Sequence, residues 1–206
     1  PLLDVDRVVL TGAERTDRAT LLDALGIAPG RPMASIDEDA AAARLRALPW
    51  VADASVAVDW PGTVRVRVRE RTAVAQAGRG AAAVQVDAEG RALGPADAER
   101  PLPSIGSVAP EVGERVSAAA RVRAGVVAGL PAALRSQVDE VRTDDGSIVA
   151  ELDDGIEVRL GEPTQLRTKG EAVLALLDQA DRTTIASIDV AVPGAAALTR
   201  NDGGGA

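Results

Sequence analysis

The 206-residue sequence contains no cysteine, histidine, phenylalanine or tyrosine. The absence of cysteine excludes disulfides and thiolate metal sites. Without histidine, general acid–base catalysis near neutral pH would need a carboxylate or a lysine with a perturbed pKa. The nucleophile route that remains is a Ser/Thr–Lys pair, and Lys169 is the only lysine. These absences argue against an enzyme, and nothing in the sequence indicates a cofactor or a metal site.

Charge and hydropathy exclude further classes. The net charge is −8, and there is no basic stripe interleaved with aromatics, which argues against nucleic-acid binding. No stretch approaches the ~20 apolar residues that a membrane span needs. The chain opens on Pro1 rather than methionine, so we expect a processed product or an excised fragment of a longer protein.

Apolar residues make up 46% of the chain, but the core has to be built from valine, leucine, isoleucine and alanine. Trp50 and Trp60 are the only aromatic residues, and each adjoins a proline. A buried aromatic side chain contributes ~150–250 Å² of contact area. We therefore expect structural roles for both: Trp50 fills the gap where a helix turns into a sheet, and Trp60 lies on the apolar face at the end of a hairpin.

The first seventy residues predict the order β-α-α-β-β. Residues 5–10 predict a strand, and the leucine spacing at 17–25 predicts a helix. Asp37 is a good N-cap for a second helix, which Pro49 ends because its ring cannot continue the hydrogen-bond ladder. Two strands then flank a turn at residues 60–62.

The two strands around this turn show a period-2 alternation that fixes their register. If Pro61-Gly62 closes a hairpin with Asp59 opposite Thr63, each face of the pair has a consistent composition. The apolar pairs are Val58–Val64, Val56–Val66 and Ala54–Val68, and the polar pairs are Ser55–Arg67 and Asp53–Arg69. One face is apolar and one is charged, so helices should cover only one side.

A second region of strands and two helices follows a polar stretch at residues 72–80, a plausible hinge. We expect a strand–turn–strand at 83–93, a helix capped by Ser117, a three-stranded meander at 138–160, a helix that begins at Pro163, and short strands at 185–190 and 195–199. Asp-Gly dipeptides mark the tight turns of the meander.

Two polar features have competing interpretations. The pairs Asp144-Asp145 and Asp153-Asp154 could hold Ca²⁺, but each precedes a glycine between strands, and turn chemistry already explains that. Lys169 could serve a Ser–Lys hydrolase, but a solvated surface lysine is the favoured interpretation. We prefer the structural interpretation of each.

The arginines of the second hairpin strand lie on its polar face, at Arg65, Arg67, Arg69 and, just beyond, Arg71. This row could bind acidic lipid headgroups or a partner. The solvated face of a half-buried strand, with Asp53 opposite Arg69, also accounts for it, and we favour that interpretation.

The last expected strand lies at a sheet edge unless another element covers it. Proteins usually block such edges with charge, proline or bulges, and residues 195–198 contain neither charge nor proline. An extended partner segment could add there by β-augmentation. The sequence leaves this alternative and a covered edge open.

Several motifs together resemble a known family. The segments VVLTGAE, LGIAPGRPMASID and LRALPWVADASVAVDWPGTVRVRVRERTAVA resemble the POTRA domain of FtsQ/DivIB division proteins. The segments VDAEGRAL, LPSI and SIDVAVPGAAAL then occur in the order found in the FtsQ β domain. Alanine at position 73 stands where the family often has proline, and the family's C-terminal aromatics are absent. The resemblance covers nearly the whole chain.

The resemblance implies an α+β fold in which a POTRA domain at residues 1–75 precedes a mostly antiparallel β domain at 76–200 with two helices, and a disordered tail at 201–206. It implies a non-enzymatic divisome scaffold with a single membrane span before Pro1 and this region outside the cytoplasm. The implied partners are FtsB/DivIC-like and FtsL-like proteins and other divisome membrane proteins. The composition suggests a GC-rich, actinobacterial source.

In the family, the last strands and a nearby helix contact the partner. Carried over position by position, the implied partner-binding residues are Ile185, Ser187, Ile188, Val190, Ala195, Ala196, Ala197, Leu198, Thr199 and Arg200, with Lys169 and Val173 on the helix. The residues expected to be structural are Gly12, Trp50, Trp60 and Pro61. The alternative function is a POTRA module of an outer-membrane assembly or secretion system that binds extended polypeptide.

Overall fold

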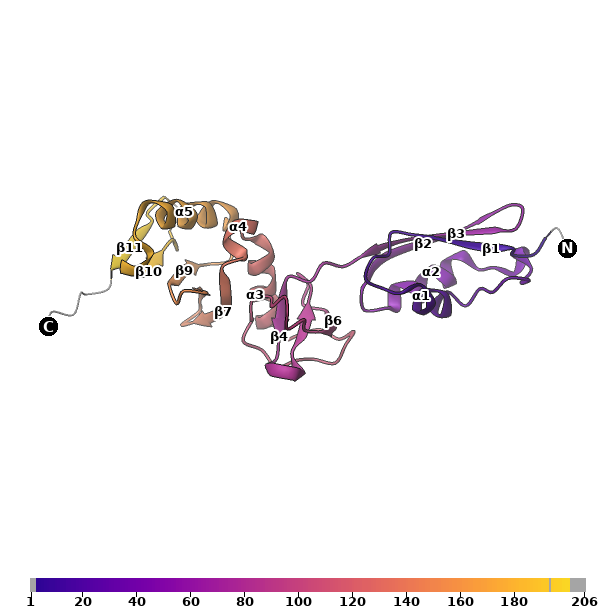
Figure 1. The fold of residues 1–206 in the computed structure, drawn as a ribbon, viewed down its shortest axis with the longest axis horizontal. Coiled ribbons are helices and arrows are strands. Elements are labelled where there is room, and N and C mark those ends of the chain that lie inside the picture. Colours follow the sequence, from indigo (N-terminus) through magenta and orange to yellow (C-terminus); the bar gives the residue numbers. More distant parts are fainter. Residues whose placement is uncertain (1–2, 193, 201–206) are drawn as a thin grey trace. The chain divides into compact units, whose positions relative to one another are not determined.

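The computed structural model describes residues 3–192 and 194–200 (Figure 1). The chain divides into two compact units, Pro1–Thr72 and Ala73–Ala206. The tail expected to be disordered, residues 201–206, lies outside the described residues.

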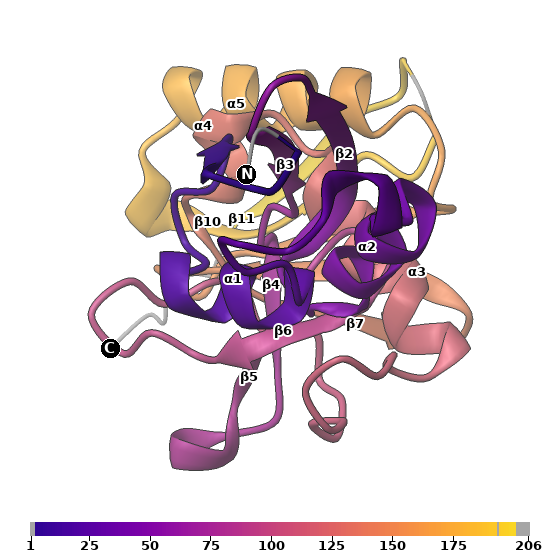
Figure 2. The same ribbon diagram turned by 90° about the vertical axis from the view of Figure 1, so that its right-hand side faces the viewer.

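The first unit has the expected β-α-α-β-β order. Its elements are β1 (Arg7–Thr11), α1 (Arg18–Leu25), α2 (Glu38–Ala47), β2 (Val51–Asp59) and β3 (Thr63–Glu70), with a 3-10 turn at Met33–Ser35. The sheet order is β1-β3-β2, and β1 runs parallel to β3. Both helices pack on one face of this sheet (Figures 1 and 2).

The helix boundaries of the first unit follow from their caps. The Asp17 carboxylate accepts the N–H of Thr20 at 2.9 Å, and Asp37 accepts that of Ala40 at 2.9 Å. Each bond satisfies a backbone donor that the first helical turn leaves without a partner. Gly26 ends α1 in the left-handed conformation with a φ of 65°.

The hairpin register predicted from the alternation is confirmed. Asp59 pairs with Thr63, and every further pair named above is observed between β2 and β3. The inward residues of β3 are buried, whereas Arg65, Arg67 and Arg69 are exposed. The charged face of the sheet is thus the one without helices.

The expectation for Trp60 is wrong. Its side chain is 53% exposed, because β2 ends at Asp59 and Trp60 belongs to the turn, beyond the last strand pair. The Trp60–Pro61 peptide bond is cis. Trp50 is half-buried at the end of α2, and the Arg15 guanidinium lies 5.1 Å from its ring centroid. Trp50 therefore packs at the helix–sheet junction, whereas Trp60 adds little to the core.

Glu70, at the end of β3, holds the loop that follows β1. Its carboxylate accepts the backbone N–H groups of Glu14 at 3.0 Å, Arg15 at 2.9 Å and Thr16 at 2.7 Å. Partial desolvation raises the pKa of Glu70, but these donors outweigh it and hold the pKa below its ordinary value of 4.5. One ionised side chain thus joins two segments that are far apart in the sequence.

A lowered pKa makes this clamp pH-dependent. The ionised form of Glu70 is favoured in the folded state, so its contribution is present above the unfolded pKa near 4.5 and is lost as the pH falls through the lower folded-state pKa. We expect Glu70→Gln to lower the free energy of unfolding by about 1 kcal/mol at neutral pH, discounted for partial exposure. Urea unfolding followed by tryptophan fluorescence measures this. The difference from the wild type should shrink in acid; an undiminished difference would contradict the clamp.

The second unit contains three helices and eight strands among its described residues. They are β4 (Ala75–Ala77), β5 (Val84–Val86), β6 (Ala92–Pro95), α3 (Ala118–Gly129), α4 (Ala132–Arg135), β7 (Val138–Asp144), β8 (Ser147–Leu152), β9 (Glu157–Gly161), α5 (Leu166–Gln179), β10 (Ile185–Asp189) and β11 (Ala197–Arg200). Short 3-10 turns lie at Gly80–Ala82 and Arg182–Thr184.

Its strands form a five-stranded sheet of order β11-β10-β9-β8-β7 and a three-stranded sheet β4-β5-β6. All pairings are antiparallel except β9 with β10. Helix α5 contacts β9, α3 and α4, and its buried residues join the core of the unit. The mixed α+β fold with a mostly antiparallel second region is confirmed.

Three details differ from the sequence predictions. Strand β4 lies within residues 72–80, which were expected to form a hinge, and it pairs with β5. Helix α5 begins at Leu166 rather than Pro163, because the Thr164 N–H donates to the Glu162 carbonyl in a turn and Gln165 has a φ of 53°. The four-residue helix α4, between α3 and β7, was not expected.

Candidate functional site

Strand β11 forms one edge of the five-stranded sheet. Within the described residues it pairs only with β10, through Ser187–Thr199, Ile188–Leu198 and Asp189–Ala197. The strand contains no proline, and its one charged residue is Arg200 at its end, which pairs with Ile185 beyond a register shift in β10. Its other side is therefore open to a further strand.

The hydrogen bonding of β10 shows which backbone groups lie on this open side. The Val190 N–H donates to the Arg159 carbonyl of β9 at 2.9 Å. Backbone groups alternate in direction along a strand, so the N–H and C=O of Ile188 also point toward β9. The N–H and C=O of Ser187 and of Asp189 point toward β11. Their partners in β11 then point back toward β10. Leu198, between them, directs its N–H and C=O to the open edge.

The side chains of the predicted partner surface divide into buried and exposed sets. On β10 and just after it, Ile185, Ile188 and Val190 are buried, and Ser187 is partly exposed. Leu198 packs partly against the core. The side chains that face solvent are Ala195, Ala196, Ala197, Thr199 and Arg200. This edge therefore exposes mainly backbone N–H and C=O groups, with small side chains beside them.

The expectation of a solvated surface lysine at position 169 is wrong. Lys169 is 2% exposed, and its ammonium group donates to the carbonyl oxygens of Leu160 at 2.7 Å and Glu162 at 2.8 Å. Val173, one turn further along α5, is fully buried. These two side chains thus support β9, the strand beside β10, and present no surface to a partner.

The acidic pairs of the meander lie at its turns, with Asp144 as the last residue of β7. Asp145-Gly146 joins β7 to β8 with φ values of 45° and 81°, and Asp154 pairs with Arg182 at 2.7 Å. In the part of the chain that the structure describes, no group of three or more acidic residues is arranged to hold a metal ion.

The arginine face of the first unit is partly neutralised. Arg65 pairs with Asp59 at 2.5 Å, and Asp53, although opposite Arg69 in the sheet, pairs with Arg46 of α2 at 3.2 Å. Arg67 and Arg69 are exposed, and the interpretation of this row as a solvated strand face stays a prediction.

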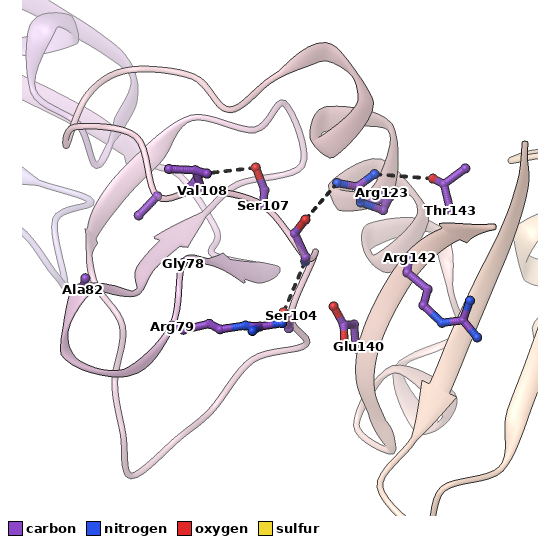
Figure 3. A pocket seen from close by; sticks show the side chains of 12 residues that line it. Gly78, Arg79, Ala82, Ser104, Ser107, Val108, Arg123, Glu140, Arg142 and Thr143 are labelled. Carbon is purple, nitrogen blue, oxygen red and sulfur yellow. Dashed lines mark hydrogen bonds between the residues drawn. The ribbon is translucent and has the colours of Figure 1, made fainter. Parts of the chain in front are cut away.

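Sequence reasoning missed a recess of about 710 Å³ in the second unit (Figure 3). It is lined by residues of the segment 78–82 after β4, of the segment 104–109, of α3 and of β7. Because these segments are far apart in the sequence, no local motif marks it. Its only sequence signal is a basic side chain, Arg79, next to two glycines.

Comparisons with known proteins agree with this architecture. Residues 3–71 match the model of the FtsQ-type POTRA domain, and residues 73–191 match the model of the cell division protein FtsQ/DivIB C-terminal region. The chain belongs to the FtsQ/DivIB family of cell division proteins. The two matched regions meet where the structure divides into two units.

Among the relatives of this FtsQ/DivIB chain are proteins named cell division protein FtsQ. That of Mycobacteroides abscessus is 32% identical over 89% of this chain and 58% of its own length. That of Mycobacterium leprae is 29% identical over 89% and 53%, and that of Streptomyces collinus 31% over 95% and 77%. The chain spans little more than half the length of the first two.

A solved structure, the major extracytoplasmic domain of DivIB from Geobacillus stearothermophilus, aligns at 22% identity with a TM-score of 0.37 over 55% of this chain and 98% of that one. The likeness is too slight to carry an argument. Among the described residues, no helix is both long and apolar enough to cross a membrane.

Proposed function

We propose that this FtsQ/DivIB chain is the extracytoplasmic part of a single-pass membrane protein that acts as a divisome scaffold, and that it binds FtsB/DivIC-like and FtsL-like partners. Binding occurs by strand addition at the open edge of β11. The role requires recognition and no chemistry, which agrees with a sequence without histidine or cysteine.

The single observation that carries the proposal is the open edge of β11. Leu198 directs a donor and an acceptor outward, and the solvent-facing side chains of residues 195–197 are all alanine. A partner strand can therefore pair with this edge, and main-chain hydrogen bonds supply the contact. Because the edge has no aromatic anchor of the kind that dominates many interfaces, we expect the backbone to provide a large share of the affinity.

Strand β10 and helix α5 support this edge from within the unit. Ile188, opposite Leu198, is fully buried, and Lys169 fixes the end of β9 to α5. We propose that the buried residues predicted at the partner surface hold the edge in place, and that the exposed ones touch the partner.

The experiment is a titration of the chain against the extracytoplasmic segments of FtsB/DivIC-like and FtsL-like proteins, beside a chain truncated after Pro193. We expect binding by the intact chain and its loss on truncation, with far-UV circular dichroism showing that the rest stays folded. Binding that survives truncation would contradict the assignment to β11. No binding by either chain would contradict a scaffold role for this region alone.

A further inference from the structure

The recess in the second unit lies at the end of a slot, one strand wide, between β4 and β7. Ser104 bridges two strands, β4 at Gln76 and β7 at Glu140, both in the parallel sense. Its N–H donates to the Asp139 carbonyl at 2.7 Å, and its carbonyl accepts the Val141 N–H at 2.8 Å. The extended backbone at Ser104 thus already fills this slot, over the length of a single β-bridge.

Beyond Ser104, the segment leaves the slot and β7 continues alone. Gly106 turns away with a φ of 53°, and Ser107 then approaches Gly78 at the end of β4. Because Asp139 and Val141 bond to Ser104, the odd-numbered residues of β7 face this side. The Val141 carbonyl and the Thr143 N–H and carbonyl therefore lie along the recess, where no described residue pairs with them.

One arginine holds the end of the slot open. Arg123 of α3 donates through Nε to the Ile105 carbonyl at 2.7 Å and through its other nitrogens to the Gly106 carbonyl and the Thr143 hydroxyl, each at 3.4 Å (Figure 3). These bonds fix the turn at Ile105 and Gly106, where the segment bends away from β7. The recess is therefore a formed feature of the fold.

Three of the side chains that line the recess, two charged and one apolar, are available to contact a ligand. Arg79 and Glu140 lie on opposite walls near Ser104 (Figure 3), and neither forms an ion pair or side-chain hydrogen bond with any residue that the structure describes. Val108, also on the wall, is 87% exposed. Arg142 belongs to the lining too, but it pairs with Glu157 at 2.6 Å.

We propose that this recess is a second docking site, for an extended acidic peptide segment of a partner protein. The segment continues the line of Ser104 and bonds to the free edge of β7 at Val141 and Thr143. An acidic side chain meets Arg79 and an apolar one meets Val108, while Glu140 accepts a peptide N–H or hydroxyl. The site lies beside β7, at the opposite end of the five-stranded sheet from β11, and it does not depend on the proposed binding at that edge.

The test starts from a phage-displayed library of short random peptides selected on the immobilised chain. We expect enriched sequences with an acidic residue among β-forming ones, and a synthetic peptide of that sequence should shift the amide signals of Thr143 and Gly106 in the ¹⁵N-labelled chain. Arg79→Glu should weaken its affinity at least ~tenfold, through loss of one charge-assisted contact and added repulsion. Arg79 is exposed, so this variant should fold.

Two controls separate the recess from the β11 edge. Arg200→Glu makes the same charge change on β11 and should leave the peptide affinity unchanged, whereas Thr143→Pro removes the edge donor and should weaken binding like Arg79→Glu. Failure to enrich any peptide, equal binding to Arg79→Glu and wild type, or amide shifts confined to β11 would each overturn the proposal. If the FtsB/DivIC-like segment does not bind at β11 and the peptide still binds the recess, the proposed function alone is contradicted.

Discussion

Gly12→Ala is expected to lower the free energy of unfolding of the first unit by about 3 kcal/mol or more. Gly12 follows β1 with a φ of +86°, and a Cβ placed there would meet the carbonyl oxygen of Val68 far inside van der Waals contact. A left-handed conformation alone costs an alanine roughly 1–2 kcal/mol. The clash with the backbone of β3 adds to this, because neither strand can move without breaking the sheet.

Gly30→Ala is the matched control for this prediction. Gly30 has nearly the same φ, +85°, but a Cβ there would meet nothing within 4 Å. It should cost only the conformational term, so the difference between the two variants measures the close approach of Gly12 to β3. Both tryptophans lie in the first unit, so urea unfolding followed by their fluorescence reports that unit. Equal losses in the two variants would contradict the close-approach argument.

Lys169→Met is expected to destabilise the second unit by about 2 kcal/mol. Methionine keeps most of the buried stem, but the Leu160 and Glu162 carbonyls lose the ammonium donor that they share. The Leu160 carbonyl is buried, so water cannot replace the donor there. A buried polar group left without a partner costs more than the hydrogen bond contributed.

The control for this variant lies two residues earlier on the same helix. The Arg167 side chain is 83% exposed and makes one long ion pair with Glu171 at 3.8 Å, so Arg167→Met should change stability by less than about 0.5 kcal/mol. Thermal unfolding followed by far-UV circular dichroism measures both variants. The tryptophan transition of the first unit should stay in place. A Lys169→Met transition at the wild-type temperature would show that the carbonyls need no donor.

Features set by local sequence were predictable. The β2–β3 register follows from a period-2 pattern on both strands around one turn, and the cap at Asp37 follows from residue type and position. The family was also recognisable, because its motifs are local segments such as the one around Trp50. What the alternation could not show is where helix coverage stops. Trp60 continues the apolar face in sequence, but it lies in the turn, outside the core.

Features set by distant contacts were not predictable. Glu70 bonds to backbone groups 54–56 residues away, and the donors of Lys169 reach β9 and the loop after it. In both cases the partner is a backbone atom, which has no sequence signature. The recess is a stronger example, since its walls come from four segments. The sequence located the candidate edge at β11, but it could not separate the exposed residues of the predicted partner surface from the buried ones.

The most direct test of strand addition at β11 changes its open edge at one backbone position. Leu198→Pro removes the N–H that points outward and spares the bonds to β10, while Leu198→Ala shortens the same side chain and keeps the N–H. Titrated with the FtsB/DivIC-like extracytoplasmic segment, the proline variant should lose at least ~tenfold in affinity relative to the alanine variant. Equal affinities of the two variants, both folded, would show that the partner does not pair with this edge.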